Sequence, residues 1–353
     1  MRKFAVFSGF LGSGKTTTMI ALTQYYSQKY QKAAMISNDL GHGVDLADHL
    51  LARFQGANAS EITGECICFC HDILTARLNS CFADGCELVV SDIPGFGVGA
   101  LEHVYHGLNE EYPGQYELAP FTVLTEPETV GILRSGADAD LTHILHAQLM
   151  EADLIVLNKC DQISEEQKEA DKAWLAGRYP QARVIAISAL QKERLDELCL
   201  ALREGHASLR HPDINYEEER LQSEMGSLSE SYLQYRAVVC CDDFDGTAYL
   251  REMAGQVQKE FQNSGREIPH LKLLAWEPEG DFGKVDLLGA GKPIETTRPF
   301  ERRCTELAVV LNANAACPAE ELERILSAAV RAVSDAYQLE LYIFKSDCFG
   351  MGG

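Results

Sequence analysis

Short apolar runs alternate with longer amphipathic stretches through the first two hundred residues. Runs such as KFAVFSG, CELVVSD and ADLIVLNK are apolar over their whole length rather than at every second position. Such runs are typical of strands that are buried on both faces, as in a parallel sheet covered by helices. The stretches between them predict helices at 15–30, 139–151, 165–178 and 193–203. The pattern therefore predicts an α/β domain with a doubly wound, mostly parallel sheet.

The pattern changes after residue 208. Residues 209–231 are polar and acidic and lack an apolar period long enough to build a core, which indicates a linker. Beyond it, two strand-helix-strand units are expected, with helices at 247–263 and 318–336 and a hairpin through KVDLLG between them. The predicted organisation is a first domain at 1–208, a linker at 209–231 and a smaller α+β domain at 232–353.

Composition narrows the classes of function. A chain of 353 residues is long enough for two domains. The formal net charge of −22 argues against a nucleic-acid partner, because such binding depends on Lys and Arg that neutralise phosphates. No apolar run approaches the roughly 20 residues of a membrane span, so no membrane association is expected. Twelve cysteines without a secretory signal predict reduced thiols and a cytoplasmic location.

A glycine-rich segment lies between the first predicted strand and the first predicted helix. It reads GFLGSGKT and fits G-x-x-x-x-G-K-[ST]. The glycines let backbone N–H groups converge on phosphate oxygens, the lysine adds a positive charge, and the threonine hydroxyl binds Mg²⁺. This motif predicts a P-loop NTPase. The residues expected to bind the nucleotide are Gly9, Gly12, Ser13, Gly14, Lys15, Thr16 and Thr17, with Lys15 and Thr16 also serving hydrolysis.

A second buried run, LVVSDIPG, ends in a carboxylate. Asp92 is positioned like the residue that holds the magnesium shell through water, and Gly95 offers a backbone amide to the γ-phosphate. Asp92 is therefore predicted to be a catalytic, magnesium-binding residue; the alternative is that it only caps the next segment. The residue after Gly95 is Phe96 and not a glutamine that could orient water, so intrinsic hydrolysis is expected to be slow.

A third segment, NKCD, follows the buried run ADLIVLN and indicates the base. The Asp161 carboxylate can accept hydrogen bonds from N1–H and the 2-amino group of guanine, which adenine cannot offer. This argues for GTP and against a small-molecule kinase, which has no use for such a segment. The residues expected to bind the base are Asn158, Lys159 and Asp161, together with Ser188, Ala189 and Leu190 after the run ARVIAIS.

With these motifs in place, the chain resembles the CobW/HypB/UreG family of GTPases, most nearly the CobW-like, cobalamin synthesis protein-like branch. The resemblance covers residues 1 to about 209 through GFLGSGKTT, NDLG, the cysteine cluster, DIPG, EADLIVLNKCD and SAL. It implies a metallochaperone that couples GTP hydrolysis to metal delivery or to maturation of a metal- or corrinoid-dependent enzyme. A client enzyme of that kind is the implied partner.

This chain departs from the pattern of the branch at three places. Where the branch usually has C-x-C-C, this chain has Cys66, Cys68 and Cys70 on alternate positions. His42 stands where members typically have a glutamate, and DIPG replaces E-[ST]-x-G. Beyond the predicted linker we find none of the family's usual landmarks.

The three cysteines of GECICFCH stand on alternate positions. In an extended segment Cys66, Cys68 and Cys70 would project together while Ile67 and Phe69 point into the core, yet the outer sulfurs would lie about 13 Å apart, too far to share an ion. Either a turn begins near Cys70 and brings it or the next residue, a histidine, closer, or two chains of a homodimer each supply two thiolates. Such ligands favour Zn²⁺, with Co²⁺ or Ni²⁺ as further possibilities. A core or redox role is the alternative.

Several other residues carry weaker signals. His42 is either a further ligand or a polar loop residue. The pairs His103/His106 and His143/His146 have helical spacing and are expected to be solvated or satisfied within the core. Cys348 in the C-terminal segment is expected to belong to an uneventful terminus rather than to transfer metal.

Two functions remain in competition at this point. The first is a GTP-hydrolysing metallochaperone-like protein that associates as a nucleotide-dependent homodimer. The alternative is a nucleotide-switched binding module in which the cysteines form a structural site.

Overall fold

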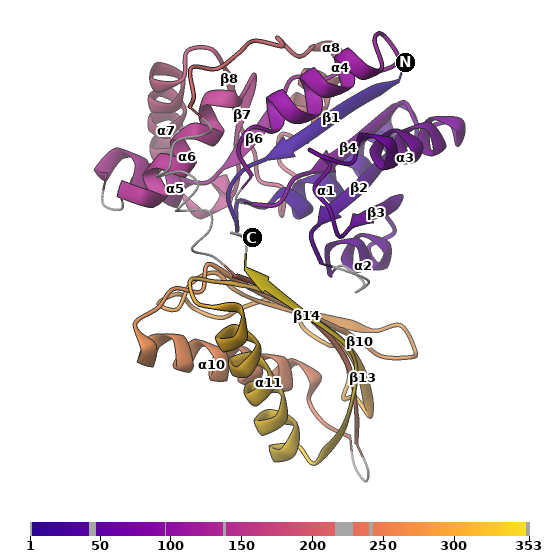
Figure 1. The fold of residues 1–353 in the computed structure, drawn as a ribbon, viewed down its shortest axis with the longest axis vertical. Coiled ribbons are helices and arrows are strands. Elements are labelled where there is room, and N and C mark those ends of the chain that lie inside the picture. The colour runs from indigo at the N-terminus through magenta and orange to yellow at the C-terminus, as the bar shows by residue number, and fades with distance from the viewer. Residues whose placement is uncertain are drawn as a thin grey trace. The chain divides into compact units, whose positions relative to one another are not determined.

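The computed structural model describes residues 2–41, 47–95, 97–136, 139–215, 229–239 and 243–350, with the backbone alone at 139–141. The chain forms two compact units (Figure 1). Unit 1 comprises Met1–Leu40 and Gln55–Leu221, and unit 2 comprises Gly41–Phe54 and Gln222–Gly353. Within the described ranges, no helix has the length and apolar character needed to cross a membrane.

Unit 1 is built on a parallel sheet of order β3-β2-β4-β1-β6-β7-β8, with the short β5 paired to β1. Strands β2, β3 and β4 lie on one side of β1, and β6, β7 and β8 lie on the other. Because crossovers between parallel strands are right-handed, helices cover both faces of such a sheet, which confirms the doubly wound fold. The strands are β1 (Lys3–Ser8), β2 (Ala33–Asp39), β3 (Ala59–Thr63), β4 (Leu88–Asp92), β5 (Glu117–Leu118), β6 (Thr122–Thr125), β7 (Leu154–Leu157) and β8 (Arg183–Ala186).

Four helices of unit 1 were predicted and are present within two residues of the expected bounds. They are α1 (Lys15–Lys29), α6 (Ala139–Glu151), α7 (Glu165–Arg178) and α8 (Leu195–Glu204). Local signals explain α7, because Ser164 accepts a hydrogen bond from Gln167 N and the first turn is acidic. The sequence pattern did not predict α3 (His71–Ala83), the π-helix η1 (Leu101–His106), α4 (Gly107–Glu111), α5 (Pro127–Ser135) and the 3₁₀ helix η2 (Cys160–Gln162).

Unit 2 is an antiparallel sheet of order β12-β11-β10-β13-β9-β14 with two long helices. The predicted repeat is present as β9-α10-β10 and β13-α11-β14, and the order β10-β13-β9-β14 is that of a ferredoxin-like fold. The elements are β9 (Ser229–Val239), α10 (Gly246–Ser264), β10 (His270–Trp276), β11 (Phe282–Leu287), β12 (Glu295–Arg298), β13 (Glu306–Ala315), α11 (Ala319–Ala336) and β14 (Leu339–Gly350).

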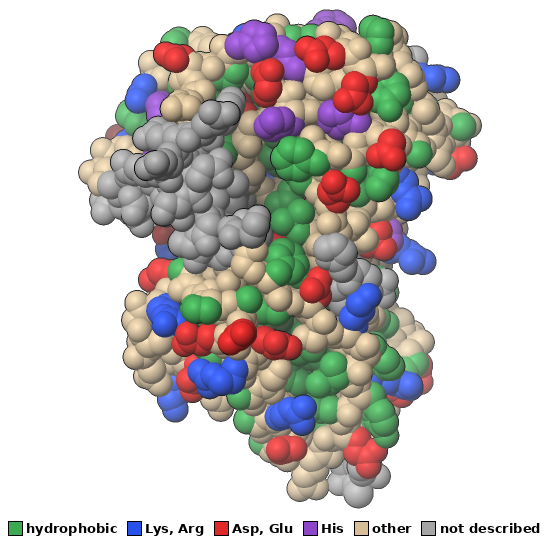
Figure 2. All heavy atoms as spheres, viewed as in Figure 1, with side chains coloured by type: hydrophobic (Ala, Val, Ile, Leu, Met, Phe, Trp, Pro, Cys, Tyr) green, Lys and Arg blue, Asp and Glu red, His purple; other side chains and the backbone are tan. Residues whose placement is uncertain are grey.

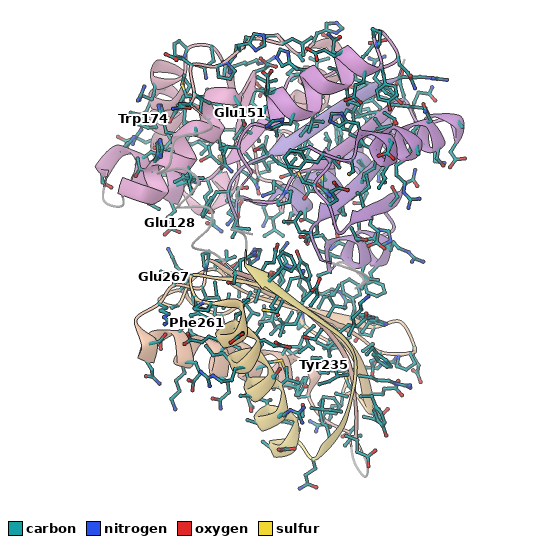
Figure 3. The ribbon with its side chains drawn as sticks, in the orientation of Figure 1. Glu128, Glu151, Trp174, Tyr235, Phe261 and Glu267 are labelled. Carbon is teal, nitrogen blue, oxygen red and sulfur yellow. The ribbon has the colours of Figure 1, made fainter. Side chains whose placement is uncertain are left out.

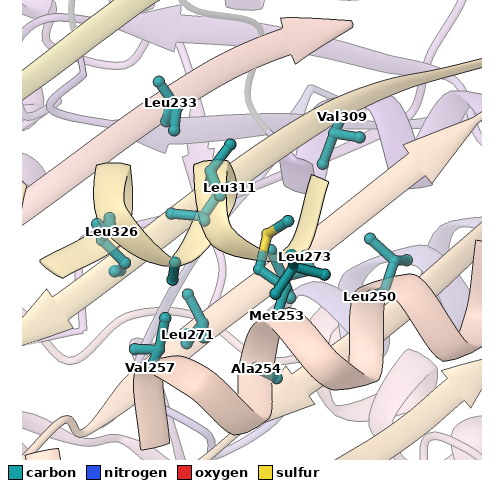
Figure 4. Close-up of a cluster of buried hydrophobic side chains, with 14 of the residues drawn as sticks. Leu233, Leu250, Met253, Ala254, Val257, Leu271, Leu273, Val309, Leu311 and Leu326 are labelled. Carbon is teal, nitrogen blue, oxygen red and sulfur yellow. The ribbon is translucent and has the colours of Figure 1, made fainter. Parts of the chain in front are cut away.

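The core of unit 2 lies between the sheet and these two helices. Figure 4 shows Met253 and Val257 of α10 beside Leu271 and Leu273 of β10, and all four side chains are fully buried. The helix α10 is well delimited, because its N-cap Asp245 accepts a hydrogen bond from the backbone and Gly265 ends it in the left-handed conformation.

A helix that lies along the chain between the two parts of unit 1 packs on the opposite face of this sheet. Because Leu271 and Leu273 face the core, Lys272 and Trp276 face the other way. There α2 (Ala47–Phe54) packs on β10 and β13: Asp48 Oδ2 lies 2.7 Å from Lys272 Nζ, and the rings of Phe54 and Trp276 are 5.7 Å apart. We assigned all of 1–208 to the first domain, and the structure corrects this for 41–54. The sequence pattern did not predict α2, and no local signal indicates against which sheet this helix packs.

Two expectations about connections also differ from the structure. The strand β9 begins at Ser229, inside the predicted linker 209–231, because its first five side chains are buried in the unit 2 sheet. The segment around Cys348, which was expected to be an uneventful terminus, forms the end of β14 and pairs with β9. There the Cys348 thiol donates to the carbonyl of Ala319 at 3.1 Å.

A buried histidine makes unit 2 sensitive to acid. Burial lowers the pKa of His270 from 6.5 to about 4, and its Nε2 lies 3.7 Å from Asp286 Oδ1. Unfolded chains therefore take up this proton at a higher pH than folded ones, and the stability present above pH 6.5 is lost as the pH falls toward 4. We expect the free energy of unfolding to drop by about 2 kcal/mol from this residue between pH 7 and pH 5.

Urea unfolding of His270→Gln and of the unmodified protein at several pH values measures this contribution. The variant should lose less free energy of unfolding between pH 7 and pH 5 than the unmodified protein, although the change in packing also lowers its stability at pH 7. Parallel pH profiles for the two proteins would show that His270 is not the responsible group.

Candidate functional site

The glycine-rich loop joins β1 to α1, as predicted. Lys15 folds back over the loop, where its Nζ donates to the carbonyl oxygens of Gly9 at 2.6 Å and Phe10 at 3.3 Å. Ser13 is buried, and its Oγ has no hydrogen-bond partner among the described residues. The first turn of α1 carries no acidic side chain, so the positive end of its dipole is available to an anion. The orphaned hydroxyl, the ammonium and the helix terminus together fit a phosphate group.

Two positions of this loop require glycine. Gly9 has φ +130°, and a Cβ there would lie 2.3 Å from the carbonyl oxygen of Leu124. Gly14 has φ +89°, and a Cβ there would lie 2.3 Å from Nδ2 of Asn158. Both the backbone conformation and the close approach of neighbours exclude a side chain. Gly12 is also left-handed, at φ +79°, while Thr16 and Thr17 lie in the first turn of α1.

The structure brings the DIPG segment beside the loop. Asp92 is the last residue of β4 and pairs in register with Phe7 of β1, so both strands end at the same edge of the sheet. The segment continues against the loop, because a Cβ on Gly95 would lie 2.5 Å from Cδ2 of Leu11. Ligands of open α/β sheets bind at this carboxyl edge, beside the point where the strand order reverses. The next residue, Phe96, lies outside the described residues.

The two predicted base-binding segments are joined to the same loop by one side chain. Asn158 Nδ2 donates to the carbonyl of Ser13 at 2.9 Å, and its Oδ1 accepts from Ala189 N at 3.1 Å. Ser188 Oγ in turn donates to Asp161 Oδ1 at 2.5 Å, which fixes the carboxylate. Through Asn158, all three segments hold one another in place.

The remaining two residues of these segments frame the carboxylate. Lys159 adopts φ +59° and its Nζ lies 2.5 Å from Glu126 Oε2, a partner that we did not predict. Leu190 is largely exposed.

The cysteine segment is a turn and not an extended strand. Phe69 N donates to the carbonyl of Cys66 at 2.9 Å, so the turn begins at Cys66 rather than near Cys70, which is the N-cap of α3. Alternation is therefore broken: Ile67 is fully buried as expected, but Phe69 is 69% exposed and not in the core. Its ring lies 5.4 Å from that of His103.

The thiols of this turn differ in their environments. Cys66 Sγ accepts from Cys68 N at 3.4 Å, and a hydrogen bond with the Cys68 thiol lowers the pKa of Cys66 while it raises the pKa of Cys68. Burial raises the pKa of Cys70 to about 11, and its Sγ donates to the carbonyl of Cys66 at 3.3 Å. In the described part of the chain, the three sulfurs do not form a set lying within 4.8 Å of one another. His71 pairs instead with Glu111, at 3.0 Å.

A buried asparagine connects this turn to Asp92. Asn38 N donates to Asp92 Oδ1 at 3.0 Å. The Asn38 side chain then holds the turn from both sides: Oδ1 accepts from Ile67 N at 3.0 Å, and Nδ2 donates to the carbonyl of Glu65 at 2.8 Å. In the sequence, Asn38 is distinguished only as part of the NDLG segment. Its position at the end of a buried strand was the one available signal, and the bonds to residues 65–67 are visible only in the folded chain.

The fold and this arrangement define a P-loop nucleotide-binding protein, with a cysteine turn hydrogen-bonded to the end of the strand that carries Asp92. The sequence model described as "CobW/HypB/UreG, nucleotide-binding domain" matches residues 3–186, just over half of the chain. The chain belongs to the CobW/HypB/UreG family of GTPases, which confirms the resemblance seen in its motifs.

Comparison with characterised proteins gives one similar relative. Zinc chaperone YeiR of Escherichia coli K12 is 28% identical over 179 residues, which cover 49% of this chain and 51% of YeiR. The chain therefore matches about half the length of this relative.

Solved structures that resemble the chain have low overall similarity. HypB of Archaeoglobus fulgidus is 20% identical with a TM-score of 0.39 and covers 57% of this chain and 88% of its own. HypB of Helicobacter pylori in complex with nickel is 19% identical with a TM-score of 0.40 and covers 57% and 85%. Zn(II)-bound YjiA GTPase of E. coli is 15% identical with a TM-score of 0.38 and covers 94% and 98%. Membership of the family rests on the sequence match.

Proposed function

We propose that this protein hydrolyses GTP and uses the nucleotide state to control a metal ion held by its cysteine turn, as a metallochaperone does. The observation that carries this proposal is the hydrogen-bonded path from Asp92 through Asn38 to the cysteine turn. Similarity to a protein named as a zinc chaperone supports the same function. The path is short, because a single residue separates the predicted magnesium-binding carboxylate from the turn.

The phosphates of GTP would lie on the loop between β1 and α1, held by its backbone amides and Lys15. Thr16 and Asp92 would hold Mg²⁺, which neutralises phosphate charge when it is bound. Lys15 is hydrogen-bonded to its own loop in this structure and would turn its ammonium toward the phosphates. Phe96 stands where a water-orienting glutamine is often found, so we expect a slow intrinsic rate.

Asp161 would recognise guanine. Its carboxylate is fixed by Ser188, and a fixed carboxylate accepts two hydrogen bonds from guanine at little cost in side-chain entropy. Asn158 would not read the base, because both ends of its amide already bind the protein.

The cargo ion would be Zn²⁺, or Co²⁺ or Ni²⁺ according to supply, bound by Cys66, Cys68 and Cys70. The thiols of Cys66 and Cys68 already contact each other, and a metal ion would replace their shared hydrogen bond. Cys70 must release the carbonyl of Cys66 before it can join them. This need for a small rearrangement makes the ion's affinity responsive to the shape of the turn.

Asn38 would transmit the nucleotide state. Asp92, which would hold the magnesium ion beside the γ-phosphate, accepts the backbone N–H of Asn38 through Oδ1, so a shift of that strand end would move the two bonds that hold the cysteine turn. The client would be an enzyme that depends on a metal or a corrinoid. We further propose that two copies associate in the GTP-bound state.

The proposal predicts that zinc affinity depends on the nucleotide and on Asn38. We expect about a tenfold difference between the GDP complex and the complex with a non-hydrolysable GTP analogue, the usual size of an allosteric coupling. Asn38→Asp should reduce the difference, because the aspartate keeps an oxygen for Ile67 N but loses the donor to Glu65. Competition with a chromophoric chelator measures each affinity.

Asn58→Asp is the matched control, because Asn58 precedes β3 at the amino edge of the sheet, opposite to Asn38, and bonds to Ala33 and Cys86 rather than to the turn. It should keep the full nucleotide effect. Equal zinc affinities in both nucleotide states of the unmodified protein, with zinc resistant to chelators in each, would replace the proposal by a binding module with a structural metal site. Light scattering in the two states tests the dimer.

A further inference from the structure

Three side chains on the surface of unit 1 form a second cluster of metal-ligand type. Glu102, His106 and His211 each offer a ligand atom, and these atoms all lie within 4.8 Å of one another. Glu102 Oε2 is 3.1 Å from His211 Nδ1 and 3.8 Å from His106 Nε2. Among the described residues this is the one such set. Figure 2 shows histidine side chains close to acidic ones on the visible face of unit 1.

These separations suit coordination to a single ion. Nitrogen and oxygen ligands bind Zn²⁺ at about 2.0–2.2 Å, which places the ligands of a tetrahedral site about 3.3 Å from one another. The two imidazole rings are stacked, with centroids 4.4 Å apart at 29°, and each has a ring nitrogen within 3.8 Å of the same carboxylate oxygen of Glu102. Two histidines and a glutamate are also the protein ligands of zinc sites that keep a fourth position open.

The fold holds each ligand in place. Glu102 and His106 stand four residues apart on the π-helix η1. Such helices are rare in proteins, and those that occur are often found at functional sites. His106 is buried, with Nε2 3.4 Å from the carbonyl of Arg210. The Arg210 guanidinium donates to the carbonyls of Met150 and Ala152, and this fixes the backbone next to His211.

We propose that Glu102, His106 and His211 bind a divalent transition-metal ion of the Zn²⁺ class, with a fourth position left to water or an incoming ligand. The site is separate from the cysteine turn and uses no thiolate. Its nitrogen and oxygen ligands suit Zn²⁺, Ni²⁺, Co²⁺ and Cu²⁺ and do not select for Cu(I). The sequence could not reveal it, because His211 lies more than one hundred residues from its partners.

The site lies on the segment that leads away from Asp92. Between Asp92 and η1 the chain is tied to α6, where Gly99 N donates to Glu151 Oε1 at 2.8 Å and Gln148 Nε2 donates to the carbonyl of Gly95 at 3.1 Å. Figure 3 labels Glu151 in unit 1. An ion at the new site would join η1 to the chain after α8. It would thus restrain the far end of the segment that begins at the predicted magnesium ligand.

Cobalt titration of the full chain tests the site, because Co²⁺ bound by thiolates has strong near-ultraviolet charge-transfer bands whereas nitrogen and oxygen ligands give only the weaker visible bands. We expect His211→Ala and Glu102→Gln each to lose one bound Co²⁺ or to bind it at least about tenfold more weakly. Loss of a residue that only supports a metal ligand already lowers affinity by about that factor. The near-ultraviolet bands should be unchanged by either variant. Competition with Zn²⁺ should displace the same ion.

His103→Ala is the matched control, because His103 is an exposed histidine of the same π-helix that is not in the cluster. It should keep the visible bands and the stoichiometry. GTP binding and circular dichroism establish that His211→Ala, a change at an exposed residue, leaves the fold intact. Unchanged stoichiometry and affinity in both ligand variants, or an equal loss in His103→Ala, would overturn the proposal. Failure of the cysteine site would remove the near-ultraviolet bands and leave this result unaffected.

Discussion

Asp161→Asn is expected to weaken GTP binding by about 1000-fold and to create binding of xanthosine triphosphate. The carboxylate accepts two hydrogen bonds from guanine, and bonds to charged groups contribute about 1.5–3 kcal/mol each. The asparagine amide instead presents N–H groups to the guanine 2-amino group, whereas xanthine has a carbonyl oxygen at that position and can accept. Isothermal titration with each nucleotide measures both affinities.

Ser188→Ala gives a graded comparison for this change. It removes the hydroxyl that holds Asp161 Oδ1 but leaves the carboxylate, so GTP binding should weaken by about tenfold without any gain for xanthosine triphosphate. Two results would contradict guanine recognition by Asp161: undiminished GTP affinity in Asp161→Asn, or equal affinity of the unmodified protein for ATP and GTP.

Gly14→Ala is expected to reduce GTP affinity by about 10- to 100-fold, the value of one charge-assisted hydrogen bond to phosphate. A Cβ at Gly14 would lie 2.3 Å from Asn158 Nδ2, so it would push apart the loop and the side chain that joins it to Ser188-Ala189. Fluorescent GTP binding and thermal unfolding, measured together, separate a loss of affinity from a loss of stability.

Gly85→Ala is the control for backbone strain. Gly85 has φ +86°, almost the same as Gly14, but no atom lies within 4 Å of a Cβ placed there. Both variants should lose about 1 kcal/mol of stability from the left-handed conformation. Only Gly14→Ala should lose nucleotide affinity. A similar loss in both would mean that strain, rather than the contact with Asn158, is responsible.

The parts of the fold that the sequence predicted are those governed by neighbouring residues. The loop between β1 and α1 carries its own glycines, and α10 is delimited by Asp245 and Gly265, so both are readable from a few consecutive letters. The strands of unit 1 are apolar throughout because both faces are covered. This explains why most strands of the sheet, including the end of β4 that carries Asp92, and the helices α1, α6, α7 and α8 were predicted at the right places, whereas β3, α3 and α5 were not predicted.

The parts that were missed depend on contacts between distant residues. Alternating cysteines predicted either a turn near Cys70 or a site shared between two chains, but the side chain of Asn38 from another strand satisfies Ile67 N and the carbonyl of Glu65 and so stabilises a turn that begins at Cys66. No pattern within GECICFCH records that partner. The destination of α2 was missed for the same reason, since Asp48 and Phe54 meet Lys272 and Trp276 across more than two hundred residues.

The excursion of residues 41–54 into unit 2 restricts how such a protein can evolve by exchange of modules. A single genetic crossover near residue 221 would combine one parent's α2 with the other parent's sheet, and the Asp48–Lys272 ion pair would have to be matched by chance. A second breakpoint around residues 41–54 is needed to transfer a complete unit 2. Unit 2 is therefore more readily altered by substitution of single residues than by replacement of the whole unit.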